Sequence, residues 1–221
     1  MTKSESNVKF FFENLGFSVG RIPEASRERP DYWLEQSNFR VAIEVKEITE
    51  NDLEKEVRLK LEIDRHAGGY ESRDDSKTLR NLIKKANSQL RELCTNGEAG
   101  ILVVQDTRPF WTKSFWMEES LKQAMFGDLV IWRLVRDAIT DSIPKTIGPK
   151  YGLNRSVTDL KNRAVSAVGI LHHNSDPKKS IMNLYHNPFA NQRLLLPVVS
   201  SEGVRQFYIG SVSDYGVFVE C

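Results

Sequence analysis

A long amphipathic segment followed by a short, wholly apolar run is the feature that most restricts how this chain can fold. Residues 77–94 place apolar side chains at helical spacing, namely Leu79, Leu82, Ile83, Ala86, Leu90 and Leu93. Residues 101–104 (Ile-Leu-Val-Val) then form a continuous apolar run, which is typical of a strand buried on both faces. Such a strand needs helices on both sides of its sheet, so the pattern predicts an α/β fold.

The residues before this pair predict a helix and three strands. A helical face over 8–15 is formed by apolar residues, with Ser4 or Ser6 as its expected cap and Gly16 as its expected end. Strands are predicted over 17–22, 32–36 and 39–48, and the polar break between the last two predicts a hairpin.

The remaining elements follow from the same periodicities. Residues 49–76 predict a helix to about residue 65 and then a loop, and residues 114–127 predict another helix. Strands are expected over 129–134, 164–171 and 181–185, with a polar stretch over 142–154 and the 181–185 strand last or next to last. No segment has the composition of a linker, so residues 1–221 are expected to form a single domain.

Composition and charge exclude several classes of protein. The 221 residues are 40% hydrophobic and 28% charged, which is ordinary for a globular chain. With 31 Lys and Arg against 30 Asp and Glu, the formal net charge of +1 excludes a polycation that binds nucleic acid through bulk charge. The polar start lacks the apolar core of a signal peptide, and no apolar run approaches the roughly 20 residues of a membrane helix. We therefore expect a cytoplasmic protein with no membrane partner.

The hairpin carries the residues with the clearest chemistry. Glu44 and Lys46 are two apart on a predicted strand and project from the same face, and Asp31 begins the partner strand. Two neighbouring carboxylates repel each other and are stabilised by a cation. Their hard oxygens suit Mg²⁺ or Mn²⁺, and the Val45 carbonyl is a candidate third oxygen. The Lys46 ammonium would then lie where an attacked phosphate develops negative charge.

In these residues, Pro30-Asp31 followed by Glu44-Val45-Lys46, the sequence resembles the PD-(D/E)XK nuclease superfamily. The resemblance implies a restriction-endonuclease-like fold, with a central mixed β-sheet flanked by helices. It covers about residues 1–106, and 107–221 would complete the sheet and shape substrate choice. It further implies a Mg²⁺-dependent nuclease that hydrolyses DNA phosphodiester bonds, with Asp31 and Glu44 as metal ligands and Lys46 as the catalytic lysine.

The resemblance also suggests auxiliary residues. Glu5 lies at the family's distance before the Gly16-Phe17 pair and is a candidate catalytic helper, as is Gln89 in the later helix. Lys84 and Lys85 belong to a local basic surface on that helix and are candidates for contacts with DNA phosphates. RNA is left open as a substrate, and the hypothesis also allows a homodimer.

Three alternatives remain beside this hypothesis. The chain could be a catalytically inactive module that binds nucleic acid or protein and keeps the nuclease fold. Two strand-end segments that contain histidine, His172-His173-Asn174 and Tyr185-His186-Asn187, resemble HNH-type metal sites, although hydrogen bonding to loop backbone is the commoner use of such histidines. An aromatic group could stack on bases, although packing is the commoner use: Phe110, Trp111, Phe115, Trp116 and Phe126.

Overall fold

The computed structural model describes residues 1–23, 28–36, 39–64, 74–94, 97–109, 117–133, 146–174, 176–194, 203–209 and 218–220. Its α-helices are α1 (Lys3–Asn14), α2 (Asp52–Asp64), α3 (Asp75–Cys94) and α4 (Met117–Phe126), with a 3₁₀ turn η1 (Pro177–Lys179). Its strands are β1 (Ser18–Arg21), β2 (Tyr32–Gln36), β3 (Phe39–Ile48), β4 (Ala99–Asp106), β5 (Leu129–Arg133), β6 (Thr146–Tyr151), β7 (Ala167–His172), β8 (Ile181–His186), β9 (Val204–Ile209) and β10 (Phe218–Glu220).

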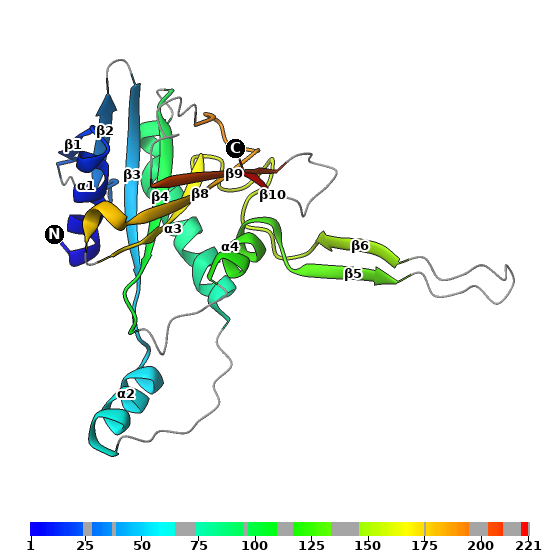
Figure 1. Ribbon diagram of the computed structural model, residues 1–221. Coiled ribbons are helices and arrows are strands. Elements are labelled where there is room, and N and C mark those ends of the chain that lie inside the picture. The colour runs from blue at the N-terminus through cyan, green and yellow to red at the C-terminus, as the bar shows by residue number, and fades with distance from the viewer. Residues whose placement is uncertain are drawn as a thin grey trace, which may run out of the picture.

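Eight of these strands form one mixed sheet in the order β1-β2-β3-β4-β7-β8-β9-β10. β3, β4 and β7 run parallel at its centre, and antiparallel pairs join β1 to β2, β2 to β3, β7 to β8 and β9 to β10. β5 and β6 pair separately and project away from the sheet (Figure 1). The prediction of an α/β fold with a mixed central sheet and flanking helices is confirmed.

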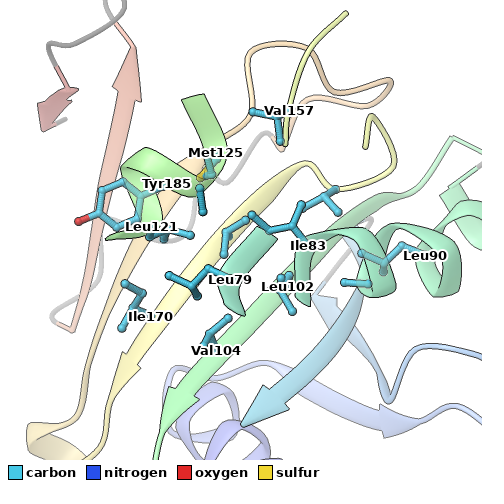
Figure 2. Packing of buried hydrophobic residues seen from close by; sticks show 14 of the residues in the cluster. Leu79, Ile83, Leu90, Leu102, Val104, Leu121, Met125, Val157, Ile170 and Tyr185 are labelled. Carbon is cyan, nitrogen blue, oxygen red and sulfur yellow. The ribbon is translucent and has the colours of Figure 1, made fainter. Parts of the chain in front are cut away.

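Each face of the sheet has its own hydrophobic core. On one face, α3 and α4 cover side chains of the central strands, and Figure 2 shows Leu79 and Ile83 of α3 above Leu102 and Val104 of β4. On the other face, Val8, Phe11 and Phe12 of α1 pack against the alternate residues of the same strands. Helices on both faces explain why β4 is buried along almost its whole length.

The start of α1 corrects the predicted cap. Thr2, rather than Ser4 or Ser6, is the N-cap, because its hydroxyl accepts the Glu5 N–H while the Glu5 carboxylate accepts the Thr2 N–H. The helix therefore begins at Lys3, five residues before the predicted range. Gly16, at a φ of 84°, follows the end of the helix as predicted, in a conformation that favours glycine.

The predicted ranges of the other described elements agree closely with the structure over the first half of the chain, and two expectations for the second half are wrong. The polar stretch over 142–154 contains strand β6, and 181–185 is neither the last strand nor the next to last, because β9 and β10 follow it. The predicted cap at Ser114 lies outside the described residues. In the part of the chain that the structure describes, no helix has the length and apolarity to cross a bilayer.

A buried arginine ties the ends of several elements together. Arg108, which follows β4, contacts Asp106 at 2.7 Å, Glu54 of α2 at 3.3 Å and Asp75 at the start of α3 at 3.4 Å. Its side chain is only 1% exposed. α2, whose Glu54 contacts Arg108, lies beyond the end of β3 and away from the sheet (Figure 1). The Leu59 side chain of α2 is half exposed.

Candidate active site

The antiparallel register of β2 and β3 brings Asp31 and Glu44 to neighbouring positions. Tyr32 pairs with Ile43, so the preceding residue Asp31 lies across from Glu44. The Asp31 N–H donates to the Ile43 carbonyl at 2.9 Å, and Oδ2 of Asp31 accepts the Val45 N–H at 2.8 Å. These two hydrogen bonds to β3 therefore hold the Asp31 carboxylate against that strand, as the sequence predicts.

Glu44 occupies a position where an apolar side chain would be expected. It pairs with Leu102 of β4, which in turn pairs with Val168 of β7, and all three residues are buried in the middle of the sheet. Only 1% of Glu44 is exposed, and its Oε2 has no hydrogen-bond partner among the described residues. A carboxylate in this environment destabilises the fold, and such local conflicts are expected at functional sites.

Burial and nearby negative charge raise the pKa of both carboxyl groups, with Glu5 as the negative neighbour of Asp31 and Asp31 as that of Glu44. Burial is the main cause for Glu44, and the charge of Asp31 adds to it, so that the Glu44 pKa rises to about 7. Burial also raises the pKa of Asp31, against the lowering effect of the Val45 N–H.

Lys46 and Gln89 are the two described partners that favour ionised Glu44. The Lys46 ammonium forms an ion pair with Oε1 of Glu44, and its side chain remains 26% exposed. Gln89 of α3 is buried and lowers the Glu44 pKa through a weaker hydrogen bond. The structure thus brings Asp31, Glu44, Lys46 and Gln89 to one place, as predicted for these candidate residues.

Glu5 lies near this group but is engaged in the cap of α1. Its carboxylate accepts the Thr2 N–H at 3.1 Å and lies 3.9 Å from the Met1 ammonium. Its charge nevertheless raises the pKa of Asp31, which places it within electrostatic range of the site. In this structure Glu5 shapes the field at Asp31 while serving as a helix cap.

The remaining candidate residues, Val45, Lys84 and Lys85, differ in how they are placed relative to the site. Val45 contacts Asp31 through its N–H, whereas its carbonyl was the group predicted to bind metal. Lys84 and Lys85 are both exposed on α3. Lys85 is one helical turn before Gln89 and shares its side of the helix, while Lys84 is rotated by about 100° from Lys85. Of the two lysines, Lys85 is the better placed to contact a phosphate at the site.

The donor set fits a hard divalent cation. Two carboxylates with raised pKa values, one of them with a buried and unsatisfied oxygen, form a group that a cation would stabilise. Mg²⁺ characteristically uses one or two carboxylates together with waters and substrate phosphates. Among the described residues, no group of three or more His, Cys, Asp or Glu side chains is arranged to hold a metal ion. A cation held by Asp31 and Glu44 would therefore need further oxygens from backbone carbonyls, water or substrate phosphates.

Two further polar clusters were not anticipated from the sequence. One is the Arg108 cluster, defined by Arg108 with Glu54, Asp75 and Asp106. The other is the Glu118 cluster, in which Glu118 of α4 accepts hydrogen bonds from Tyr185 at 2.7 Å and from Asn183 and lies 3.5 Å from His172. Both join elements far apart in sequence, so no local spacing could have indicated them.

The Glu118 cluster has the opposite electrostatics to Glu44. Its donors lower the Glu118 pKa to about 2, with the largest effect from His172, then from Tyr185 and Asn183, against the raising effect of burial. His172 is the most distant of these donors, and its effect is large because a hydrogen bond from a group that can carry charge is stronger. This histidine therefore belongs to a contact between α4 and the sheet.

The other alternative sites receive no support from the described geometry. His186 is buried against Gln206 at 2.9 Å, and burial lowers its pKa to about 4, which indicates a neutral core histidine. Phe126 is fully buried. The other members of the aromatic group, at 110, 111, 115 and 116, lie outside the described residues.

Comparisons with known proteins identified no relative of this chain. A scan of protein-family models, a search of curated proteins and a search of solved structures each found no match. Functional inference for this chain therefore rests on the residues and geometry of the site itself.

Proposed function

We propose that this protein is a Mg²⁺- or Mn²⁺-dependent nuclease that hydrolyses DNA phosphodiester bonds. The observation that carries the proposal is the convergence of Asp31, Glu44 and Lys46 on adjacent strands, with Glu44 buried at a raised pKa. The order of elements around them is α1, β1, the β2–β3 hairpin, α2, α3 and β4, and apart from the additional helix α2 it supports the restriction-endonuclease-like fold that the motif implies. The motif and the sheet that carries it support the same assignment.

In this proposal Asp31 and Glu44 hold the cation, and the Val45 carbonyl is the third protein oxygen. When bound, the cation supplies positive charge to the phosphate and makes water more acidic. Water attacks phosphorus, the bond to the leaving sugar oxygen breaks, and that oxygen takes up a proton. The products are a phosphate monoester and an alcohol.

The chain's own residues contribute charge and orientation. The Lys46 ammonium, which is paired with Glu44 and is partly exposed, is placed to stabilise negative charge on a phosphate beside Glu44. Gln89 restrains the Glu44 carboxylate from the α3 side, and α3 also excludes water from that face. Asp31, held by the Val45 N–H, cannot turn away from the strand without losing that hydrogen bond.

A binding module without catalytic activity is the second candidate. The ion pair between Lys46 and Glu44 favours it, because that pair partly neutralises the carboxylate with no cation. Such a module would bind nucleic acid or protein without cutting it, and the two candidates therefore differ in one measurable property.

The test is cleavage of plasmid and single-stranded DNA, with RNA as a further substrate, in millimolar Mg²⁺ or Mn²⁺. Wild-type protein should cut in a metal-dependent manner, and Glu44→Gln or Lys46→Ala should reduce the rate by about a thousandfold, as loss of a key electrostatic group does. Glu118→Gln is the control, since it changes a hydrogen-bonded glutamate of α4 that lies on the same face of the sheet but outside the site. It should cut at the wild-type rate.

The outcomes separate the candidates. Metal-dependent cleavage that persists in Glu44→Gln and Lys46→Ala would place catalysis elsewhere. Binding of DNA with no cleavage of any substrate in either metal would favour the inactive module.

A further inference from the structure

A pocket beside α1 has no role in the proposed chemistry. It has a volume of about 330 Å³ and is lined by Ser6, Asn7, Phe10, Phe11, His173 and Ser180. The lining comes from α1, from the end of β7 and from the residue between η1 and β8. The volume falls within the range of pockets that bind small molecules or one part of a larger ligand.

The pocket combines an aromatic wall with a polar rim. Phe10 is 48% exposed, which is unusual for a phenylalanine on an otherwise well-packed helix, whereas Phe11 is buried and packs edge-on against Phe12. The polar side chains are an amide, hydroxyls and an imidazole, all of which can donate and accept hydrogen bonds. A flat aromatic ring with polar edges, such as a nucleobase, matches both features.

Positive charge lies next to the pocket. Lys178 and Lys179 of η1 directly precede the pocket residue Ser180, and both are exposed. η1 packs against α1, so both lysines belong to a segment next to that helix. The Lys179 ammonium also lies 3.7 Å from the Asp176 carboxylate, which leaves Lys178 as the less compensated of the two charges. They would face the phosphates on either side of a base held in the pocket.

The pocket and the candidate active site share α1. Glu5, which acts electrostatically on Asp31, is followed directly by the pocket residues Ser6 and Asn7. Asn7 also donates to Gln105 of β4 at 3.2 Å, which fixes this part of α1 to the sheet next to β3. Because α3 covers the sheet face that carries Glu44 and α1 covers the other face, a strand that occupies both places would have to pass around the start of α1.

We infer that this pocket holds an unpaired nucleobase of the substrate, stacked on Phe10, so that the enzyme acts on single-stranded or frayed DNA. The inference rests on the proposed nuclease function. A base that enters the pocket must leave its partner and its stack, and that step costs least in a single strand.

The experiment measures binding separately from cleavage. Binding of a fluorescent thymidine oligonucleotide is followed by anisotropy in EDTA with Glu44→Gln protein, which is not expected to cut. A second probe has the same sugar–phosphate chain without bases. Phe10→Ala should weaken binding of the thymidine strand about tenfold, as expected for one lost base stack, and should leave the base-free strand unaffected.

Matched variants test the mechanism of the effect. Leu59→Ala on α2 removes a side chain of similar exposure, 50%, and should change neither affinity. Phe10→Trp should restore binding. Lys178→Ala should weaken both probes equally, because it would contact phosphate and not base.

The outcomes distinguish the pocket from the catalytic proposal. Equal binding of the thymidine strand by Phe10→Ala and its parent, or equal loss for both probes, would overturn the pocket, and Glu44-dependent cleavage would still stand. Phe10-dependent binding without metal-dependent cleavage would support a base-binding pocket and overturn the nuclease. No binding of either probe would overturn the pocket.

Discussion

The candidate site and the Arg108 cluster each place buried acidic side chains around one basic side chain. That side chain contacts all of the acids in the Arg108 cluster but only one of them at the candidate site. In the Arg108 cluster, one fully buried guanidinium contacts all three carboxylates, and the pKa of Arg108 is raised despite burial, chiefly by its hydrogen bond to Asp106. At the site, Lys46 pairs with Glu44 alone and is partly exposed, and the pKa of Glu44 rises to about 7.

This difference separates the structural carboxylates of the Arg108 cluster from the carboxylates of the candidate site. The planar fork of arginine can satisfy several carboxylate oxygens at once, whereas one ammonium is a point charge. Arg108 therefore contacts every carboxylate of its cluster and fastens α2, α3 and β4 together, although one guanidinium against three carboxylates leaves a formal charge of −2. At the site, no guanidinium bridges the two carboxylates and the pKa of both is raised, so that a bound cation would stabilise their ionised forms.

The largest expected effect is on the structural side of this comparison. Arg108→Met removes the common partner of three buried or partly buried carboxylates and should lower the free energy of unfolding by about 3–5 kcal/mol. Urea denaturation at neutral pH measures the loss. Arg91→Met, which removes an exposed arginine from α3, is the control and should change stability by less than about 0.5 kcal/mol. A loss for Arg108→Met no larger than that of the control would show that the cluster is not an anchor.

The opposite sign is expected at Glu44. Its pKa is about 7 in the folded protein against an ordinary 4.5, so the folded state holds its proton more tightly. Wild-type stability should fall as pH rises from about 4.5 to about 7, and Glu44→Gln should escape this fall. The variant should be more stable by about 2–3 kcal/mol near pH 8 and equal to wild type near pH 4. A variant less stable than wild type near pH 8 would contradict the assignment of Glu44 as an uncompensated charge.

Glu118 sharpens the comparison, because its donors depress its pKa to about 2. Its ionised form stabilises the fold above the ordinary pKa of 4.5, and this contribution is lost as pH falls toward 2. With the side chain 38% exposed, and allowing for solvent screening, Glu118→Gln should cost about 1–2 kcal/mol at neutral pH. Thermal unfolding should show the gap closing in acid, while the neighbouring Glu119→Gln should have little effect. A gap that does not depend on pH would mean that packing, and not charge, is lost.

The smallest expected effect is that of the metal. Millimolar Mg²⁺ should raise the melting temperature of wild type by about 2–4 °C, because a ligand that binds only the folded state stabilises it. Asp31→Asn, which retains the shape of the side chain, should not respond. An equal rise in both proteins would place the metal away from the hairpin.

The sequence predicted the site better than its surroundings. Asp31, Glu44 and Lys46 lie on one short hairpin, where strand periodicity and a local turn determine which side chains meet. The α1 cap was mispredicted, because Ser4 and Ser6 are equally good capping residues and only the Thr2–Glu5 pair completes a capping box. The Arg108 and Glu118 clusters depend on contacts between distant elements, and β9 and β10 follow the last strand that the pattern indicated. Tertiary contacts of this kind leave no periodic signal in a single sequence.

The hairpin also has a consequence for how the chain folds. The β2–β3 hairpin, which brings Asp31 to Glu44, joins strands that are neighbours in sequence. In contrast, α3 covers Glu44 only after β3 has paired with the distant β4, for example Val41 with Ala99. Local hairpins form in microseconds, and distant parallel pairing is slower. The two carboxylates thus meet while still hydrated, and Glu44 takes up its proton only in the later, long-range step. Near neutral pH, refolding should consume a proton in its slow phase, so that the raised pKa of Glu44 is acquired together with the parallel sheet.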